Sequence, residues 1–310
     1  MRRHAMTAPS RVSDLLAVHG WEAAGKTVPE GDALRTPVEL PAGIEALLYV
    51  WDDETLARRA ARVHELVGPV LFAVPEAIDS GPGWLVVGRP AGRPATQLFP
   101  SDPAARDLAL LEPMRARGLV ESLGNALRKL HSFPAQSVCG DILDEPGDAP
   151  RRWLTFSGWV AHHLEWFASD LRRRDFDDDT ASHLAKSIAD MRHELSAFHP
   201  RTPPSFCHGK LSLRHVWVDT AGREVVGLTG FDHAAWLPRE ADLAQLLWIE
   251  GLGAEETASR ALYQGYGAAR TMDVQRRERF FRRLVAFEAL VGLKGEVLRT
   301  PRELIELSSG

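Results

Sequence analysis

The stretch that decides the fold covers residues 205–244 and reads SFCHGKLSLRHVWVDTAGREVVGLTGFDHAAWLPREADLA. It predicts two short strands, at 216–219 and 224–228, because apolar runs rich in β-forming residues flank the turn residues 220–223. Polar loops lie before and after this hairpin, at 208–210 and 230–232. Such a hairpin can hold two sets of polar side chains near one ligand.

Three motifs in this stretch match a known family in order and spacing: His208 with Gly209, Asp232 behind an apolar residue, and the triplet DLA at 242–244. The stretch resembles the catalytic segment of the aminoglycoside phosphotransferase and choline kinase family, whose pattern is HGDxxxxN, a hairpin, an apolar residue followed by Asp, and a later DLA. The resemblance implies an α+β, bilobal protein-kinase-like fold. It has a small N-terminal β-rich lobe and a larger, mainly helical C-terminal lobe.

Two positions depart from the family pattern, and both carry its chemistry. Lys210 stands where the family has its catalytic Asp, and His215 stands where it has a metal-holding Asn. An Asp there accepts or orients the proton of the attacking hydroxyl, and the Asn oxygen binds Mg²⁺. A charged lysine only donates, and magnesium prefers oxygen ligands to imidazole nitrogen. The ordinary phosphotransferase chemistry is therefore in question.

The other residues of the large-lobe site follow from the same resemblance. Asp232 is the retained metal ligand, and with Lys210 and His215 it makes up the predicted catalytic set. His208 and Asp242 match residues that support the loop, so we expect them to be structural. Lys210 placed opposite Asp232 would form an ion pair that takes the space and the charge of Mg²⁺.

The sequence before this stretch predicts a β-meander and one helix. The expected elements are strands at 21–28, 33–40, 44–51, 70–78 and 84–87, a helix at 53–67 and a linker at 88–94. Five strands around one helix is the order of a kinase small lobe. We therefore expect an N-terminal β-rich lobe at 1–90 and a C-terminal helical lobe at 91–310, which holds the hairpin segment 205–232.

The small lobe resembles the family more weakly and departs from it at the nucleotide contacts. Alignment of residues 47–50 with the third strand of the family puts Tyr49 where a phosphate-steadying lysine stands, and helix spacing puts Arg59 at its glutamate partner. Tyr49, Arg59 and, in the large lobe, Arg214 are the candidate cofactor-binding residues. Beside Lys210, Arg214 would also attract an anion without any metal.

Two features near the N-terminus bear on phosphate binding. The turn at 29–32 carries Glu30 and Asp32, which would either repel a triphosphate or simply face solvent. Residues 20–27 read GWEAAGKT and fit GxxxxGK[ST], the phosphate loop of another class of nucleotide hydrolases. That loop needs a helix directly after it, and the prolines and glycine that follow prevent one. We set this interpretation aside.

After the linker the pattern is mostly helical. The expected helices are at 112–131, 153–172, 177–198, 241–249, 255–266 and 274–298. The second carries Trp159, His163 and Trp166 at helical spacing, which favours an aromatic core stripe and leaves a substrate-facing wall as the alternative. The histidines of these helices lack accompanying cysteine or carboxylate ligands, so no zinc site is expected.

Composition bounds the partners and the compartment. The 310 residues carry a net charge of -5, which gives no general attraction to nucleic acid or to an anionic membrane. Cys139 and Cys207 have no metal-ligand spacing, and we expect buried thiols in a reducing cytosol. No apolar run approaches the roughly 20 residues of a membrane span, and the first residues lack the core of a signal peptide. We expect a cytoplasmic protein.

Two functions stay open at this point. The first is a pseudokinase that keeps the family fold as a ligand-binding or regulatory module, with ATP-dependent phosphoryl transfer lost or weak. The second is an active small-molecule phosphotransferase with a rearranged site, because phosphoryl transfer depends mostly on positioning and charge. No cofactor is assigned, and Mg·ATP is expected only for the active form. The expected partner is a small-molecule ligand or an anionic metabolite, with a protein as a further candidate.

Overall fold

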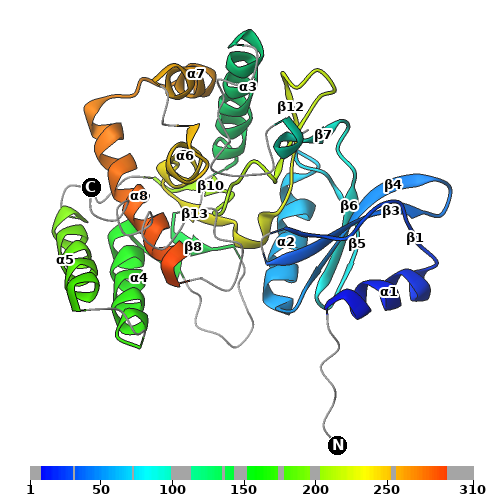
Figure 1. The fold of residues 1–310 in the computed structure, drawn as a ribbon, viewed down its shortest axis with the longest axis horizontal. Helices are drawn as coiled ribbons and strands as arrows, with labels where there is room; N and C mark the ends of the chain where they lie inside the picture. Colours follow the sequence, from blue (N-terminus) through cyan, green and yellow to red (C-terminus); the bar gives the residue numbers. More distant parts are fainter. Residues whose placement is uncertain are drawn as a thin grey trace, which may run out of the picture.

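A computed structural model describes residues 8–30, 32–71, 73–98, 113–134, 137–142, 152–173, 178–195, 203–252 and 256–291. Figure 1 shows an antiparallel sheet with helices α1 and α2 in the N-terminal part and a mainly helical C-terminal part beside it. The α+β class predicted from the sequence is confirmed. The lobe boundary at residue 90 stays a prediction. None of the helices in these ranges has the length and apolar character that a membrane span requires.

Six strands form the N-terminal sheet, in the order β1-β3-β4-β6-β5 with β2 paired to β3. They are β1 Glu22–Ala23, β2 Val28–Glu30, β3 Ala33–Leu40, β4 Ile44–Trp51, β5 Ala77–Gly81 and β6 Trp84–Gly88. Strands β3 and β4 match the prediction residue for residue. Apolar side chains alternate between two covered faces, so Tyr49 packs on the side of helix α2 (Glu54–Val67) and Leu48 on the side of α1 (Ala8–His19).

Of the two helices in the N-terminal part, the sequence predicts α2 but not α1. Helix α2 begins where predicted, since the Asp53 side chain accepts a hydrogen bond from Thr55 N at 2.8 Å and caps it. Helix α1 was not predicted, although Val12, Leu15 and Leu16 have helical spacing and pack against the sheet. The strand expected at 21–28 is two short strands, β1 and β2, both paired with β3.

The strand predicted at 70–78 is wrong. The described residues there form a loop, and β5 begins only at Ala77. The loop carbonyls have other partners, because Pro75 O lies 2.6 Å from His64 Nδ1 and Ala73 O accepts a hydrogen bond from Leu228 N at 2.6 Å. Val74 is buried in the main core and Leu71 packs against it, so these residues pack in the core instead of pairing in the sheet.

The hairpin predicted in the central stretch is confirmed. Strands β11 and β12 pair antiparallel, and β7 from the predicted linker pairs with β11. A further sheet has the order β10-β13-β8-β9, and its strands β10 and β13 lie directly before and after the two polar loops. These strands are β7 Arg93–Pro94, β8 Cys139–Asp141, β9 Arg152–Trp153, β10 Ser205–Cys207, β11 Val216–Val218, β12 Val225–Leu228 and β13 Ala235–Leu237.

The helices of the C-terminal part follow the sequence prediction closely. They are α3 Pro113–His131, α4 Phe156–Leu171, α5 Asp178–Glu194, α6 Glu240–Ala244, α7 Glu256–Tyr266 and α8 Met272–Val291. The helix expected at 241–249 changes after Ala244 into a π-helical turn, Gln245–Ile249. The last residues of the helices expected at 177–198 and 274–298 lie outside the described residues.

Helices α3 and α7 cross at two glycines. A Cβ at Gly124 would lie 2.2 Å from Leu262 O, and one at Gly265 would lie 1.8 Å from Glu121 O. These distances leave no room for a side chain, so the two backbones touch. Leu123 of α3, Leu262 of α7 and Leu228 of β12 all belong to one core cluster, so both helices pack with the hairpin. The crossing therefore supports the strands that carry the central loops.

We predict that Gly124→Ala destabilises the protein by about 1–3 kcal/mol, because the new methyl group forces α3 and α7 apart. The matched control is Gly118→Ala on the same helix, where the nearest atom to the new Cβ is Arg223 O at 3.9 Å. Alanine is the better helix former, so this variant should gain up to about 1 kcal/mol. Urea unfolding of both variants measures the difference, and equal stabilities would contradict the prediction.

Candidate functional site

One buried carboxylate fixes the loop that follows β10. Asp242 Oδ2 accepts a hydrogen bond from His208 N at 2.8 Å, and Oδ1 accepts one from Gly209 N at 2.9 Å. Gly209 has φ of +89°, and a Cβ there would lie 2.0 Å from His233 O, so only glycine fits. Burial alone would raise the pKa of Asp242, but hydrogen bonds from His131 and His208 hold it below its usual value. These are the contacts of a structural brace, the role that the sequence predicts for Asp242.

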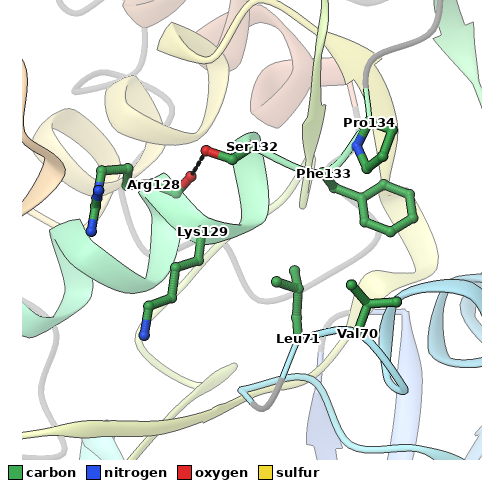
Figure 2. A pocket seen from close by; sticks show the side chains of 7 residues that line it. All are labelled: Val70, Leu71, Arg128, Lys129, Ser132, Phe133 and Pro134. Atoms are coloured by element: carbon green, nitrogen blue, oxygen red, sulfur yellow. Dashed lines mark hydrogen bonds between the residues drawn. The ribbon is translucent and has the colours of Figure 1, made fainter.

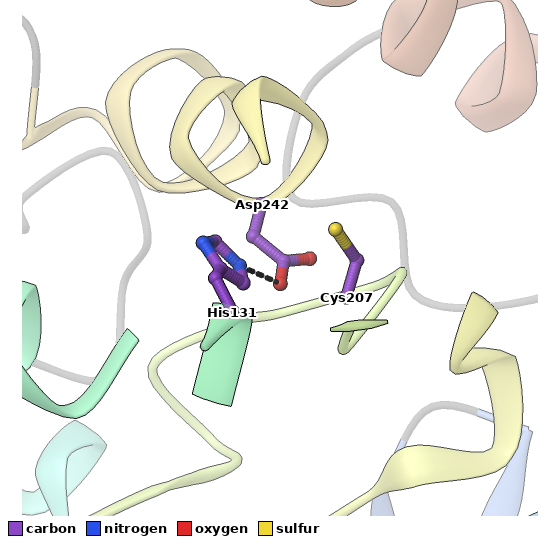
Figure 3. A group of neighbouring side chains, drawn as sticks. All are labelled: His131, Cys207 and Asp242. Atoms are coloured by element: carbon purple, nitrogen blue, oxygen red, sulfur yellow. Dashed lines mark hydrogen bonds and ion pairs between the residues drawn. The ribbon is translucent and has the colours of Figure 1, made fainter. Parts of the chain in front are cut away.

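Figure 3 shows Asp242 between His131 and Cys207. His131 Nε2 lies 3.0 Å from Asp242 Oδ2, and His131 Nδ1 lies 2.8 Å from Tyr266 Oη. Cys207 Sγ donates to Leu237 O at 3.4 Å, and burial raises the pKa of this thiol well above its usual value. The three side chains are close enough to share a metal ion, but their ligand atoms already have protein partners. Both cysteines are free and buried, as predicted.

Two histidines of the central stretch stack on each other inside the protein. The ring centroids of His208 and His215 are 4.9 Å apart, and both residues are buried. Burial lowers the pKa of each imidazole, so both are neutral near pH 7. His208 Nε2 donates to Thr229 O at 2.7 Å, and His215 Nδ1 accepts from Ser212 N at 3.3 Å. The structure thus places His215, predicted in the catalytic set, in the packed support of the loop.

Asp232 is held by strand β4 and helix α2 of the N-terminal part. It lies in a short 3-10 turn, η5 (Phe231–His233), and is 4% exposed. Trp51 Nε1 donates to Asp232 Oδ2 at 3.1 Å, and Arg59 Nη1 donates to Asp232 O at 3.1 Å. Arg59 Nη2 also lies 3.0 Å from Asp141 Oδ2 in an ion pair. Arg59, a candidate cofactor contact, therefore binds the protein itself, and an indole N–H binds one oxygen of the predicted metal ligand.

Lys210 pairs with Asp32, a residue of the turn between β2 and β3. Lys210 Nζ lies 3.3 Å from Asp32 Oδ2, and His233 Nε2 lies 2.6 Å from the same oxygen. The hydrogen bond from His233 and the charge of Lys210 lower the pKa of Asp32, while its partial burial opposes them. The prediction that Lys210 pairs with Asp232 is therefore wrong, because its partner is Asp32. The sheet brings a different carboxylate to the ammonium group, and Asp232 is bound by Trp51 instead.

Glu30 and Tyr49 belong to a buried polar cluster with Arg35 and Thr229. Tyr49 Oη donates to Glu30 Oε1 at 3.2 Å, and Thr229 Oγ1 donates to the same atom at 3.4 Å. Arg35 Nε lies 2.5 Å from Glu30 Oε2, in an ion pair without hydrogen-bond geometry. Burial raises the pKa of Glu30 to about 7, against the lowering effect of Arg35. The side chains of Glu30 and Tyr49 are both buried, so Glu30 does not face solvent and Tyr49 is not exposed to a ligand.

Aromatic side chains fill the space between the sheet and the hairpin. Trp217 of β11 is 2% exposed and packs in one cluster with Leu47, Tyr49 and Trp51 of β4. The guanidinium carbon of Arg35 lies 5.5 Å from the centre of the Trp217 ring. Direct packing therefore joins the strand that carries Tyr49 to the hairpin that follows Lys210.

Arg214 lies next to His215, and its side chain is partly exposed. Its backbone N–H donates to Ser212 Oγ at 3.3 Å, so the loop is tied down on this side as well. The role of Arg214 in binding a cofactor or an anion stays a prediction.

The aromatic stripe predicted on α4 is divided between core and surface. Trp159 is 6% exposed and packs in the core of the C-terminal part, whereas Trp166 is 46% exposed. His163 lies between them, with Nδ1 at 2.9 Å from Trp159 O. The core interpretation thus holds for Trp159, and the role of Trp166 at the surface stays open.

A cavity of about 300 Å³ lies away from the central loops, between the residues that follow α2 and the C-terminal end of α3. Figure 2 shows Val70, Leu71 and Phe133 close to one another beside it, and Lys129 of α3 also lines it. No residue of the loops at 208–210 and 230–232 lines this cavity. It is therefore separate from the candidate site.

The model of one protein family, described as the phosphotransferase enzyme family, matches residues 50–281, which is more than half of the chain. This chain belongs to the phosphotransferase enzyme family. No curated protein matches the sequence at a significant level. Family membership agrees with the resemblance carried by the HG, Asp232 and DLA motifs.

Solved structures show the same fold for this phosphotransferase-family protein. An aminoglycoside phosphotransferase, APH(3'')-Id from Streptomyces rimosus, has 16% identity and a TM-score of 0.57, with 98% of this chain and 99% of that chain covered. A putative fructosamine-3-kinase from Thermobifida fusca has 19% identity and a TM-score of 0.62, with 96% of each chain covered. An APH(2'')-type structure in complex with GDP and kanamycin has 14% identity and a TM-score of 0.64, with 96% and 95% covered. The bilobal, kinase-like fold is confirmed.

Sequence reasoning missed most of the residues that surround the predicted site of this family member. Trp51 and Trp217 lie in apolar strands and read as ordinary core residues. Asp32 reads as a turn residue, and His233 follows Asp232 without a motif of its own. Their position in the sequence could have indicated them, because Asp32 lies in the polar turn at 29–32 and His233 directly follows the polar loop at 230–232.

We predict that Glu30→Gln changes how stability depends on pH. The folded-state pKa of Glu30 is raised from 4.5 to about 7, so between these values the folded protein binds a proton that the unfolded chain releases. The wild type therefore loses on the order of 3 kcal/mol from this group as pH rises through the window. Glutamine carries no such proton, so the variant should gain stability relative to the wild type from pH 5 to pH 7.5.

Urea unfolding at several pH values measures this difference. The buried histidines titrate in both proteins, so subtraction of the two profiles isolates Glu30. Glu45→Gln is the matched control, because Glu45 lies in the same sheet with a side chain that is 67% exposed. Parallel profiles for the wild type and Glu30→Gln would contradict the assignment.

Proposed function

We propose that this member of the phosphotransferase enzyme family is a pseudokinase. It keeps the kinase-like fold as a ligand-binding or regulatory module, and its ATP-dependent phosphoryl transfer is lost or weak. The observation that carries the proposal is Lys210, a cation at the position of the family's catalytic acid, in an ion pair with Asp32. A charged ammonium group cannot accept the proton of an attacking hydroxyl.

The metal ligands support the same conclusion. Magnesium prefers several oxygen ligands in octahedral geometry. His215 replaces the family's amide with a neutral imidazole whose Nδ1 already accepts a hydrogen bond. Asp232 Oδ2 accepts a hydrogen bond from Trp51, and Lys210 holds positive charge close by at Asp32. Lys210 and His215 therefore do not fit the Mg·ATP that the family uses.

The packing of the N-terminal part gives independent support. In kinases a basic residue of the sheet steadies the phosphates and pairs with a glutamate. Here Tyr49 takes the predicted lysine position and is buried against Glu30, while Arg59 takes the predicted glutamate position and binds Asp232 O. Trp217 packs against the same strand. Nucleotide binding would require these contacts to open.

One observation favours the alternative, an active phosphotransferase with a rearranged site. Ligand atoms of Asp32, Asp232 and His233 all lie within 4.8 Å of one another, so two carboxylates and an imidazole could meet one divalent ion. Lys210 is 3.3 Å from Asp32 and competes for the same charge. This competition is why we place the pseudokinase first.

The proposal includes a small-molecule ligand and a cytoplasmic location. A structure with this fold is a complex with GDP and kanamycin, which supports a small-molecule partner for the related chain. Both cysteines are free thiols, in keeping with a reducing compartment. A protein partner stays a further candidate.

We predict that the wild-type protein binds Mg·ATP with a dissociation constant weaker than about 1 mM. Isothermal titration with Mg·ATP measures this, and an assay of ADP release in the presence of hydroxyl acceptors measures turnover. Micromolar, magnesium-dependent binding together with acceptor-dependent ADP release would overturn the pseudokinase proposal and favour the rearranged enzyme.

Restoring the family residues tests the assigned positions. We predict that Lys210→Asp combined with His215→Asn raises the affinity for Mg²⁺ by about tenfold or more, which equals about 1.4 kcal/mol. Lys210→Met with His215→Asn is the control, because it removes the cation without adding a carboxylate. Magnesium titrations of the two variants that gave equal affinities would mean that position 210 does not face the metal site.

A further inference from the structure

Two N–H donors meet on one carboxylate oxygen at the centre of the site. Asp32 Oδ2 lies 2.6 Å from His233 Nε2 and 3.3 Å from Lys210 Nζ. Because a carboxylate oxygen only accepts, His233 Nε2 carries the proton of this hydrogen bond. Lys210 and His233 thus direct two donors at one position, and charge-assisted contacts of this kind bind acid groups.

The donors and the acceptor belong to different parts of the fold. Lys210 and His233 come from loops that touch at Gly209, where a Cβ would lie 2.0 Å from His233 O. The contact of these loops and the brace from Asp242 hold the backbone beside both donors in place. Asp32 comes from the turn between β2 and β3, 178 residues before Lys210 in the sequence. The acceptor can therefore leave while the donors stay together.

The contact between Asp32 and Lys210 is open to solvent. The side chains of Lys210 and Asp32 are 47% and 44% exposed, and that of His233 is 23% exposed. Exposed ion pairs contribute little to stability, because water and salt screen them. A ligand that offers the same acceptor therefore reaches a contact that solvent already reaches.

The surrounding charges favour a ligand with a single negative charge. Asp232 Oδ2 lies 3.9 Å from His233 Nε2, and Arg59 is already paired with Asp141. Without Asp32, the site keeps the ammonium of Lys210 and the Nε2–H donor of His233, and the carboxylate of Asp232 lies next to His233. A carboxylate brings one negative charge close to Asp232, whereas a phosphate dianion would bring two, so repulsion from Asp232 favours the carboxylate.

We infer that Lys210 and His233 form a binding site for the carboxylate group of a small molecule, and that Asp32 fills this site when the ligand is absent. The inference rests on the proposed function, since it names the ligand class of the proposed module. Binding of the acid frees Asp32, and with it the β2–β3 turn, from the central loops. The ligand thereby changes a contact between the sheet and the hairpin side of the site, as a regulatory module requires.

The test is rescue of the full-length variant Asp32→Ala by acetate, read as the midpoint of thermal unfolding. Sodium acetate should raise this midpoint by about 3 °C more than sodium chloride of equal ionic strength, once acetate exceeds its dissociation constant about tenfold. Methyl phosphate, which carries more negative charge, should give a smaller rise. Asp32→Ser repeats the measurement in case the alanine variant does not fold, because serine also shortens the side chain and suits a turn.

Three controls make the result specific. The wild type should respond less, because Asp32 occupies the site. Asp32→Ala combined with Lys210→Met should lose the acetate response. Glu45→Ala removes an exposed acid that pairs with Arg89 at 3.2 Å in the same sheet, and it should respond to acetate no more than to chloride.

The inference is overturned if acetate acts like chloride on both Asp32 variants, if the response survives Lys210→Met, or if methyl phosphate stabilises more than acetate. The last outcome would assign the site to phosphate groups instead. These readouts involve no nucleotide. Failure of the acetate rescue alone removes the acid site, whereas tight Mg·ATP binding by the wild type removes the proposed function whatever acetate does.

Discussion

The hydrogen bonds of the Asp242 carboxylate are the interaction on which the centre of this protein depends. A buried charge is costly unless it is paired and hydrogen-bonded. Asp242 is fully buried and satisfies this condition with the backbone N–H groups of His208 and Gly209 and with His131. Because the two backbone donors lie in the loop itself, satisfying the carboxylate also fixes the path of the chain into Lys210. The loop is rigid for a reason independent of which residue occupies position 210.

A fixed loop with an altered side chain changes what the N-terminal sheet can do. The loop presents the ammonium group of Lys210, which forms an ion pair with Asp32 from the turn beside the sheet. Trp51 and Arg59 bind Asp232 from the same side, and Trp217 packs against β4. Each contact is local, but together they pack the sheet against the central loops and pair most of the charges there within the protein.

The site differs from the family pattern in two independent ways, in the charge at position 210 and in the packing of Tyr49 and Trp217. On the proposed alignment, the lysine at position 210 cannot accept a proton while it is charged, whatever the shape of the site. Burial of Tyr49 and Trp217 limits space whatever the charges are. A site with only one of these changes would be a weak enzyme, whereas both together suit a protein that binds without reacting. The contact of Asp32 with Lys210 is open to solvent, and it is where we propose that a ligand binds.

The sequence by itself determined most helices and strands, and it showed that Lys210 and His215 depart from the family pattern. Apolar periodicity and turn residues predicted β3, β4, α2, the central hairpin and most C-terminal helices, because each depends on local side-chain patterns. The same reasoning failed for residues 70–78, whose carbonyls bind His64 and Leu228 from other elements. It also paired Lys210 with the wrong carboxylate. Only the tertiary structure decided that Asp32 and Trp51 reach the central loops, because they lie 178 and 181 residues from Lys210 and Asp232, their partners, and no local pattern encodes such contacts.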